Sequence, residues 1–222
     1  MPRWGNLRRT RPFSANFGFE RGVPVDRHYL HRFLEANRAR IAGDVLEIQG
    51  TGYSRRYGGD ALRTASSVDI DARHDPTFVC DLARADAVLP AESFDCILLP
   101  NTLQLVERLD DSLRQIMRLL RPGGAFLASV GGLLPLIPDS PDDEYFRHTP
   151  AGWRKLLAAA WPEAHVEVEG HGNCLAVCAA ALGLALDELD AAELDANDPR
   201  MPVLVTILAV KPDAPGAAGA VN

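Results

Sequence analysis

Short apolar runs alternate with stretches of helical periodicity along most of the chain. Residues 94–99 are apolar nearly throughout, which is typical of a central strand buried on both faces of a parallel sheet. The segment from Asp110 to about Leu120 carries apolar residues at helical spacing, and Pro122 and the glycines after it end this helix. The alternation predicts an α/β fold with a seven-stranded, mostly parallel sheet and helices on both faces. The other strands are expected at residues 44–48, 67–71, 77–80, 125–130, 165–169 and 203–210.

The two ends of the chain lie outside this alternation. Residues 1–16 are basic and show no periodicity, and residues 212–222 are rich in Ala, Gly and Pro, so we expect both to be disordered tails. Asp26 is expected to cap a helix from Arg27 to about Arg40. Because this helix precedes the first strand, it can either pack on the sheet or cover the carboxyl ends of the strands as a lid.

Composition limits which kinds of binding partner and which cellular compartment are expected for this protein. The chain has 222 residues and a formal charge of −7, which disfavours nucleic acid as a main partner. No apolar run reaches the length of a membrane span, so no membrane partner is expected. Cys80 and Cys96 lie in apolar runs, and Cys174 and Cys178 lack a second Cys/His pair at zinc-like spacing. We therefore expect reduced thiols, a cytoplasmic protein and no metal site, while a homodimer is left open.

The first predicted strand ends in an acidic residue followed by glycines. Glu47 closes this apolar run, and Gly50 and Gly52 follow in the loop. Glycines let a backbone approach a ligand closely, which is typical of the cofactor loop of a parallel α/β sheet. A carboxylate at this position favours a ligand that carries an amine or a sulfonium over a pyrophosphate, because pyrophosphate is bound by a helix N-terminus.

Acidic residues also end the next two predicted strands. Asp69 lies 22 positions after Glu47, which is about the spacing at which a carboxylate binds a ribose diol, and Asp71 is the alternative on the same face. Asp81 can accept a hydrogen bond from an adenine amine, and Leu82 offers an apolar surface for the ring. These acids predict a nucleoside-containing cofactor.

The motifs together resemble those of the class I S-adenosylmethionine-dependent methyltransferases, in particular the small type-11-like group. The resemblance covers roughly residues 41–130 and rests on motifs that recur in the family's order and at its distances. They are Leu46-Glu47-Ile48, Val68-Asp69-Ile70, Cys80-Asp81-Leu82, Ser93-Phe94-Asp95-Cys96-Ile97 and Leu119-Leu120-Arg121-Pro122-Gly123-Gly124. Segments 21–30 and 145–150 look like those of bacterial members found beside glycosyltransferases or in biosynthetic clusters.

The resemblance implies a Rossmann-like methyltransferase domain over residues 17–211. Its expected parts are an N-terminal lid helix at 17–42, a cofactor-binding core at 43–130 and a substrate-side cap with the final strands at 131–211. S-adenosylmethionine is the implied cofactor. Glu47 would orient its methionyl amine, the loop with Gln49, Gly50 and Gly52 would hold the methionine moiety, Asp69 or Asp71 would bind the ribose, and Asp81, Leu82 and Asn101 would complete the site.

One departure from the family pattern falls in the cofactor loop. The family's loop usually reads acid-x-Gly-x-Gly, whereas Gln49 and Thr51 occupy the two glycine positions here and the glycines are displaced by one. The departure implies a different loop path or weaker cofactor binding.

The resemblance does not identify the methyl acceptor. We expect metal-independent transfer to an oxygen or nitrogen of a small molecule such as a sugar or a secondary metabolite. His148 is the first candidate for the base, with His171 next and Tyr145 as a further lining residue. A catalytically silent partner subunit with the same fold is the alternative. An NAD-dependent oxidoreductase is disfavoured because no Gly-x-Gly-x-x-Gly motif is present.

Overall fold

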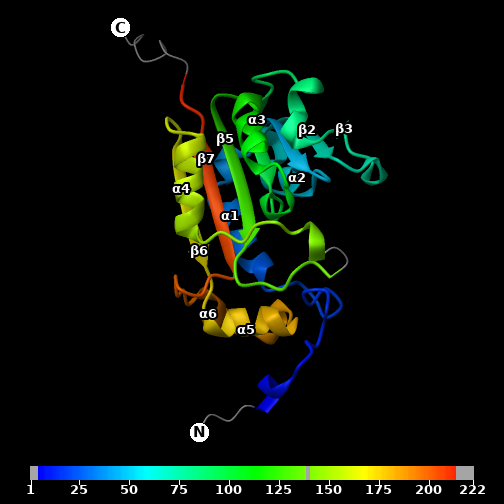
Figure 1. Cartoon of the computed structure of the whole chain (residues 1–222), viewed down its shortest axis with the longest axis vertical. Coiled ribbons are helices and arrows are strands. Elements are labelled where there is room, and N and C mark those ends of the chain that lie inside the picture. Colours follow the sequence, from blue (N-terminus) through cyan, green and yellow to red (C-terminus); the bar gives the residue numbers. More distant parts are fainter. Residues whose placement is uncertain (1–4, 139–140, 214–222) are drawn as a thin grey trace.

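The structure, a computed structural model, describes residues 5–138 and 141–213 and is built on one seven-stranded sheet (Figure 1). The strand order is β3-β2-β1-β4-β5-β7-β6. Every pairing is parallel except those of β7, which runs antiparallel to both β5 and β6. The prediction of a Rossmann-like, mostly parallel sheet is confirmed. The strands are β1 (Gly43–Ile48), β2 (Leu62–Asp69), β3 (Phe78–Val79), β4 (Phe94–Leu99), β5 (Leu120–Gly131), β6 (His165–His171) and β7 (Leu204–Val210).

Helices cover both faces of the sheet, and the alternation of side chains along β4 shows why. Ile97 and Leu99 point into one apolar core, which also contains residues of α3 and α4. Cys96 and Leu98 point into a second core on the other face, which contains residues of α1 and α5. Successive residues of a strand face opposite sides, so a strand covered on both faces has to be apolar throughout. The helices are α1 (Asp26–Ala36), α2 (Gly52–Gly58), α3 (Leu109–Leu119), α4 (Pro150–Ala160), α5 (Cys174–Leu182) and α6 (Ala191–Asp195).

The predicted helix ends differ from the observed ones for identifiable reasons. Helix α1 ends at Ala36 and not near Arg40, and Arg38–Arg40 form a separate 3-10 turn. Helix α5 ends at Leu182, where Gly183 adopts a left-handed conformation (φ 69°) and caps it. Asp26 does not cap α1: Val25 holds the cap position, and no side chain bonds the helix N-terminus there. The Asp26 carboxylate instead accepts a hydrogen bond from Asn101 at 3.0 Å.

Helix α1 packs on the sheet along its length and reaches the carboxyl ends of the strands only with its first turn. Tyr29, Leu30 and Leu34 are buried in the second core. Packing is therefore the main role of this helix, and at the carboxyl ends of the strands only its N-terminal turn lines a pocket.

Part of the predicted N-terminal tail is ordered. The Phe13 amide donates to the Leu182 carbonyl at 2.8 Å, and Ser14 is buried against the end of α5. The segment thus lies beside α5 at the lower end of the molecule (Figure 1). Residues 1–4 and 214–222 of the two predicted tails lie outside the described residues.

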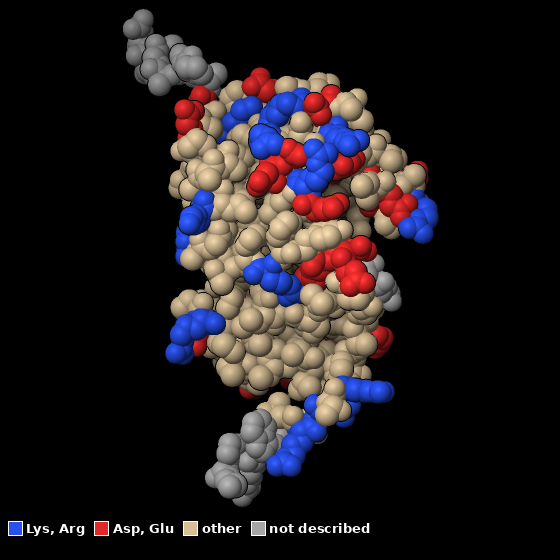
Figure 2. Space-filling view, in the orientation of Figure 1, with Lys and Arg blue, Asp and Glu red and all other residues tan. Residues whose placement is uncertain are grey.

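Charges of both signs are mixed on the face drawn in Figure 2. Blue and red side chains lie next to one another over the upper part of the molecule, and further basic side chains follow the N-terminal segment at the lower end. Within residues 5–138 and 141–213, no helix combines the length and the apolar character that crossing a membrane requires.

Candidate functional site

Two adjoining pockets open at the carboxyl ends of the parallel strands. The first, here called the strand-tip pocket, has a volume of about 450 Å³ and is lined by Asp69, Asp71, Asp81 and Leu82 among others. It lies where the strand order reverses between β1 and β4, the place at which open α/β sheets bind their ligands. The predicted acidic motifs at the ends of β2 and β3 thus come together in one cavity of ligand size.

The second pocket, here called the loop pocket, has a volume of about 290 Å³ and lies between the start of α1 and the loop after β5. Its lining includes Asp26 and Arg27 from the first turn of α1 and Glu144 and Arg147 from the loop. Both pockets are lined by Gln49, Pro100, Asn101 and Leu105, so these residues form the wall between them.

Glu47 lies beneath the cofactor loop and has only 3% of its surface exposed. Its two carboxylate oxygens accept hydrogen bonds from the backbone amides of Tyr53 at 3.0 Å and Ser54 at 2.7 Å. Burial raises the pKa of Glu47, and these two amide bonds oppose that shift. Glu47 does not line either pocket. In this structure the carboxylate caps the N-terminus of α2 and fixes the loop, which differs from the expected contact with a ligand amine.

The strained residue of the loop is Gln49, the residue at the family's first glycine position. Gln49 has φ +62°, in the left-handed region that favours glycine. A Cβ at Gly50 or Gly52 would meet no other described atom within 4 Å, and neither glycine has positive φ. The fold therefore does not require these two glycines, and they leave open space above the loop.

We expect Gln49→Gly to stabilise the fold by roughly 0.5–1 kcal/mol, because glycine adopts this conformation without a Cβ clash. Gln49→Ala is the matched control: it also removes the side chain but keeps the strained Cβ, so it is expected to give no gain. Urea unfolding of the three proteins measures the difference. Equal stability of the glycine and alanine variants would contradict the assignment of strain to φ.

Asp69 and Asp71 differ in how they are held at the end of β2. Asp69 has 6% of its surface exposed and accepts hydrogen bonds from the Asp71 amide at 2.8 Å and from His74 Nδ1 at 2.6 Å. Asp71 is paired with Arg73, whose hydrogen bonds lower the pKa of Asp71 to about 2. Asp69 therefore presents a carboxylate oriented by the protein, whereas Asp71 is engaged by a solvent-exposed arginine.

Asn101 connects the two pockets. It follows β4 and has φ +50°. Its backbone amide donates to Ser129 Oγ at 3.0 Å, and its side-chain Oδ1 accepts a hydrogen bond from the same hydroxyl at 3.1 Å. Its Nδ2 donates to Asp26. A residue held by its backbone and by both ends of its amide group keeps the shared wall in one position.

The three candidates for acceptor chemistry are not brought together. Tyr145 lines the strand-tip pocket. His148 lines neither pocket: its ring stacks on Phe146 and meets the edge of Trp153, with centroids 5.6 and 5.0 Å away. This packing fits a structural role better than that of a base.

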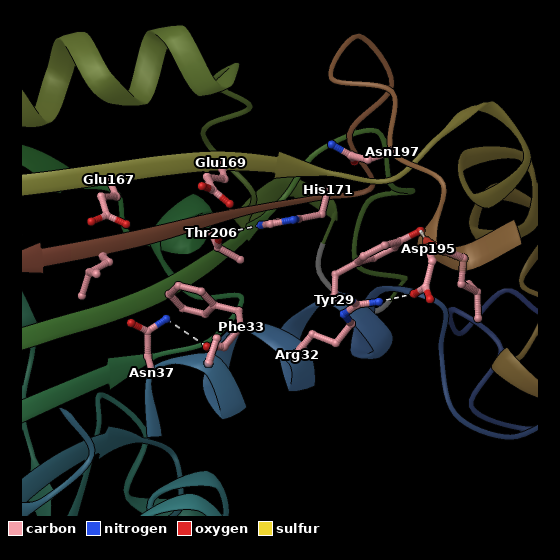
Figure 3. A pocket seen from close by; sticks show the side chains of 13 residues that line it. Tyr29, Arg32, Phe33, Asn37, Glu167, Glu169, His171, Asp195, Asn197 and Thr206 are labelled. Atoms are coloured by element: carbon pink, nitrogen blue, oxygen red, sulfur yellow. Dashed lines mark hydrogen bonds and ion pairs between the residues drawn. The ribbon is translucent and has the colours of Figure 1, made fainter. Parts of the chain in front are cut away.

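His171 lines a separate pocket between α1 and β6 (Figure 3). Its Nε2 lies 2.7 Å from Thr206 Oγ1, and its ring stacks against Tyr29. Burial lowers the pKa of His171, so the neutral ring is favoured. His171 does not line either pocket at the strand ends, which argues against it as the base there.

Several lining residues were missed from the sequence. His74 follows β2 and orients Asp69, and a histidine five residues after a strand-tip acid was the available signal. Gln104 and Glu144 line the loop pocket without any motif to mark them. Within the part of the chain that the structure describes, no group of three or more His, Cys, Asp or Glu side chains is placed to hold a metal ion.

The strand-tip pocket fits the adenosyl part of S-adenosylmethionine. Asp69 offers an oriented acceptor for a ribose diol, and Leu82 offers an apolar surface for a purine. Of the predicted loop residues, Gln49 lines the pocket, whereas Gly50 and Gly52 are exposed and line neither pocket.

Comparison with known proteins finds methyltransferases with a similar fold. Residues 47–128 match the model of a family described as a methyltransferase domain. No curated protein matches the chain. Similar solved structures include an S-adenosylmethionine-dependent methyltransferase from Mesorhizobium loti, with TM-score 0.55, 20% identity, and coverage of 79% of this chain and 96% of that one.

Two further structures have the same fold. A SAM-dependent methyltransferase from Archaeoglobus fulgidus gives TM-score 0.54 and 13% identity over 83% of this chain and 94% of that one. Phosphoethanolamine N-methyltransferase 2 of Haemonchus contortus, in complex with S-adenosyl-L-methionine, gives TM-score 0.53 and 16% identity over 91% of this chain and 54% of that one. The fold is that of the class I S-adenosylmethionine-dependent methyltransferases.

Proposed function

We propose that this protein transfers a methyl group from S-adenosylmethionine to an oxygen or nitrogen of a small molecule, without a metal ion. The observation that carries the proposal is the pair of pockets with a common wall. The strand-tip pocket provides the carboxylate and the apolar surface that an adenosyl group needs. The loop pocket opens on the other side of Gln49 and Asn101 and leaves space for an acceptor.

The cofactor supplies a methyl group already activated on a sulfonium, so the protein mainly has to align it with the acceptor and remove a proton. Asp69 and Leu82 would fix the nucleoside. The wall formed by Gln49 and Asn101 would set where the methyl group meets the acceptor. Asp26 would hold the Asn101 amide from the side of α1.

S-adenosylhomocysteine is expected to bind the full chain with Kd of about 1–10 μM, equivalent to about −7 to −8 kcal/mol. Isothermal calorimetry measures this directly, and NAD is the control ligand, for which no binding is expected. Binding should survive EDTA, because no metal is invoked. An absence of heat and of a thermal shift at millimolar S-adenosylhomocysteine would contradict the proposal.

The same measurement tests the second candidate, a silent partner subunit. The observation that favours it is Gln49, a non-glycine residue held at φ +62° in the cofactor loop. A partner subunit would keep its fold and fail to bind the cofactor.

A further inference from the structure

Two buried acceptor oxygens of the loop pocket have no donor. Glu144 Oε2 and Gln104 Oε1 are inaccessible to solvent and have no hydrogen-bond partner among the described residues. The Glu144 side chain is only 2% exposed, and Gln104 is 5% exposed. A buried acceptor without a donor costs about 1–3 kcal/mol, and more when it is charged. Both residues line the same pocket, so a ligand there can supply the missing donors once a small shift of the lining uncovers the two oxygens.

Gln104 is held in place by hydrogen bonds to the surrounding backbone. The Gln104 carbonyl accepts hydrogen bonds from the amides of Tyr145 at 2.8 Å and Phe146 at 3.3 Å, which brings Gln104 next to the residue that follows Glu144. The Gln104 Nε2 group donates to the Asn101 carbonyl at 3.0 Å. That bond fixes the orientation of the amide and leaves its oxygen as the group without a partner.

Arg147 holds the other carboxylate oxygen of Glu144 and the loop around it. The guanidinium pairs with Glu144 Oε1. It also donates to the carbonyls of Gly132 at 2.9 Å, Leu134 at 2.8 Å and Pro135 at 3.1 Å. Of the two carboxylate oxygens of Glu144, Oε2 is thus the one that remains for a ligand, and the Arg147 contacts preorganise it.

The rest of the pocket favours a neutral ligand. Glu144 is paired with Arg147 and Asp26 with Arg27, so the four charges of the lining compensate one another. Apolar lining comes from Phe17, Phe19, Leu134, Pro135, Ile137 and Pro138. A neutral polyhydroxy compound of carbohydrate type supplies adjacent hydroxyl donors and apolar C–H faces. The volume of about 290 Å³ is at the lower limit for ligand pockets and suits a single small unit.

Building on the methyltransferase function proposed above, we infer that Glu144 is the catalytic base and that Glu144 and Gln104 together select a polyhydroxy acceptor. One acceptor hydroxyl donates to Glu144 Oε2 and a neighbouring hydroxyl donates to Gln104 Oε1. The first hydroxyl gives its proton to Glu144 as its oxygen forms a bond to the methyl carbon. The carbon–sulfur bond breaks and its electron pair stays on sulfur, so the sulfonium becomes a thioether and the product is a methyl ether.

The test measures transfer of a labelled methyl group from S-adenosylmethionine to two panels of probes. One panel contains neutral monosaccharides and their methyl glycosides, and the other contains primary amines and phenols. Label is expected in the first panel only. Label confined to amines or phenols, or to neither panel in a protein that binds S-adenosylhomocysteine, overturns the inference and leaves the methyltransferase proposal intact. A protein that does not bind S-adenosylhomocysteine overturns both.

Two variants then separate the roles on the best monosaccharide. Glu144→Gln keeps the shape but cannot take the proton, so kcat should fall by about 10²- to 10⁴-fold. Gln104→Met removes an acceptor that binds the second hydroxyl, so KM should rise by about tenfold with a smaller change in kcat. The matched control is Asp143→Asn, an exposed residue of the same loop, and it should match the wild type.

Binding of S-adenosylhomocysteine to each variant shows whether the fold and the strand-tip pocket are intact. Unchanged affinity is expected for all three. A Glu144→Gln variant that keeps both this affinity and wild-type kcat overturns the role of Glu144 as base. If Glu144→Gln loses affinity for S-adenosylhomocysteine, Glu144→Asp replaces it in the test. Aspartate keeps a carboxylate at a shifted position, so this variant should retain part of the kcat if Glu144 is the base.

Discussion

Asp69→Asn is expected to weaken binding of S-adenosylhomocysteine by about tenfold to a hundredfold. Hydrogen bonds to a charged group contribute about 1.5–3 kcal/mol, and the ribose diol would lose its carboxylate. The asparagine oxygen can still accept from the Asp71 amide, so the turn after β2 should keep its conformation. Calorimetry gives the affinity, and thermal unfolding without ligand checks that the fold is unchanged.

Asp71→Asn is the matched control, because it makes the same change two residues away in the same pocket. Asp71 is paired with Arg73 at the surface, so its variant should bind the ligand nearly as well as the wild type. His74→Ala removes the second partner of Asp69 while keeping the carboxylate, and a smaller loss than that of Asp69→Asn is expected. A larger effect of Asp71→Asn than of Asp69→Asn would mean that the ribose carboxylate has been assigned to the wrong residue.

Most of the sheet could be predicted because its strands have a local apolar signature; β2 is the exception, since it begins at Leu62 and not at residue 67, and residues 62–66 carry no apolar run. Residues 94–99 are apolar on both faces, and the predicted bounds of this strand coincide with those of β4. Helix α2 had no such signature: Gly52–Gly58 begins and ends in glycine and has no apolar stripe. Glu47 stabilises it from the preceding strand, a contact between side chain and backbone that periodicity does not encode.

The strand-tip pocket was predictable for a similar reason, and the loop pocket was not. The parallel strands bring their carboxyl ends to one edge, so acids at the ends of β2 and β3 had to lie near one another. Glu144 and Gln104 lie 40 positions apart on irregular segments, joined by the backbone hydrogen bonds to the Gln104 carbonyl. From the sequence, His148 is a stronger candidate for a base than either of them. It packs against Trp153 and Phe146, however, and sequence alone does not show that packing.

Glu47→Gln is expected to destabilise the protein by about 2–3 kcal/mol. Both oxygens of Glu47 accept backbone amides, and glutamine can accept only one of them. Its NH₂ group would face the other amide and leave two buried donors without an acceptor, each costing about 1–3 kcal/mol if the loop does not relax. For a domain of this size the loss corresponds to a fall in Tm of roughly 5–10 °C.

Two measurements on this variant distinguish a loop support from a ligand contact. If Glu47 supports the loop, the Tm of the ligand-free variant is lower than that of the ligand-free wild type. The affinity for S-adenosylhomocysteine then falls as well, because the loop carrying Gln49 and Gly50 is less ordered. If Glu47 instead contacts the ligand amine, affinity falls while Tm without ligand stays near the wild-type value. Glu92→Gln is the matched control, since Glu92 is exposed, its one ion pair among the described residues is with Lys211, and the change should alter neither quantity. The buried position of Glu47, with both oxygens bonded to the start of α2, favours the first outcome.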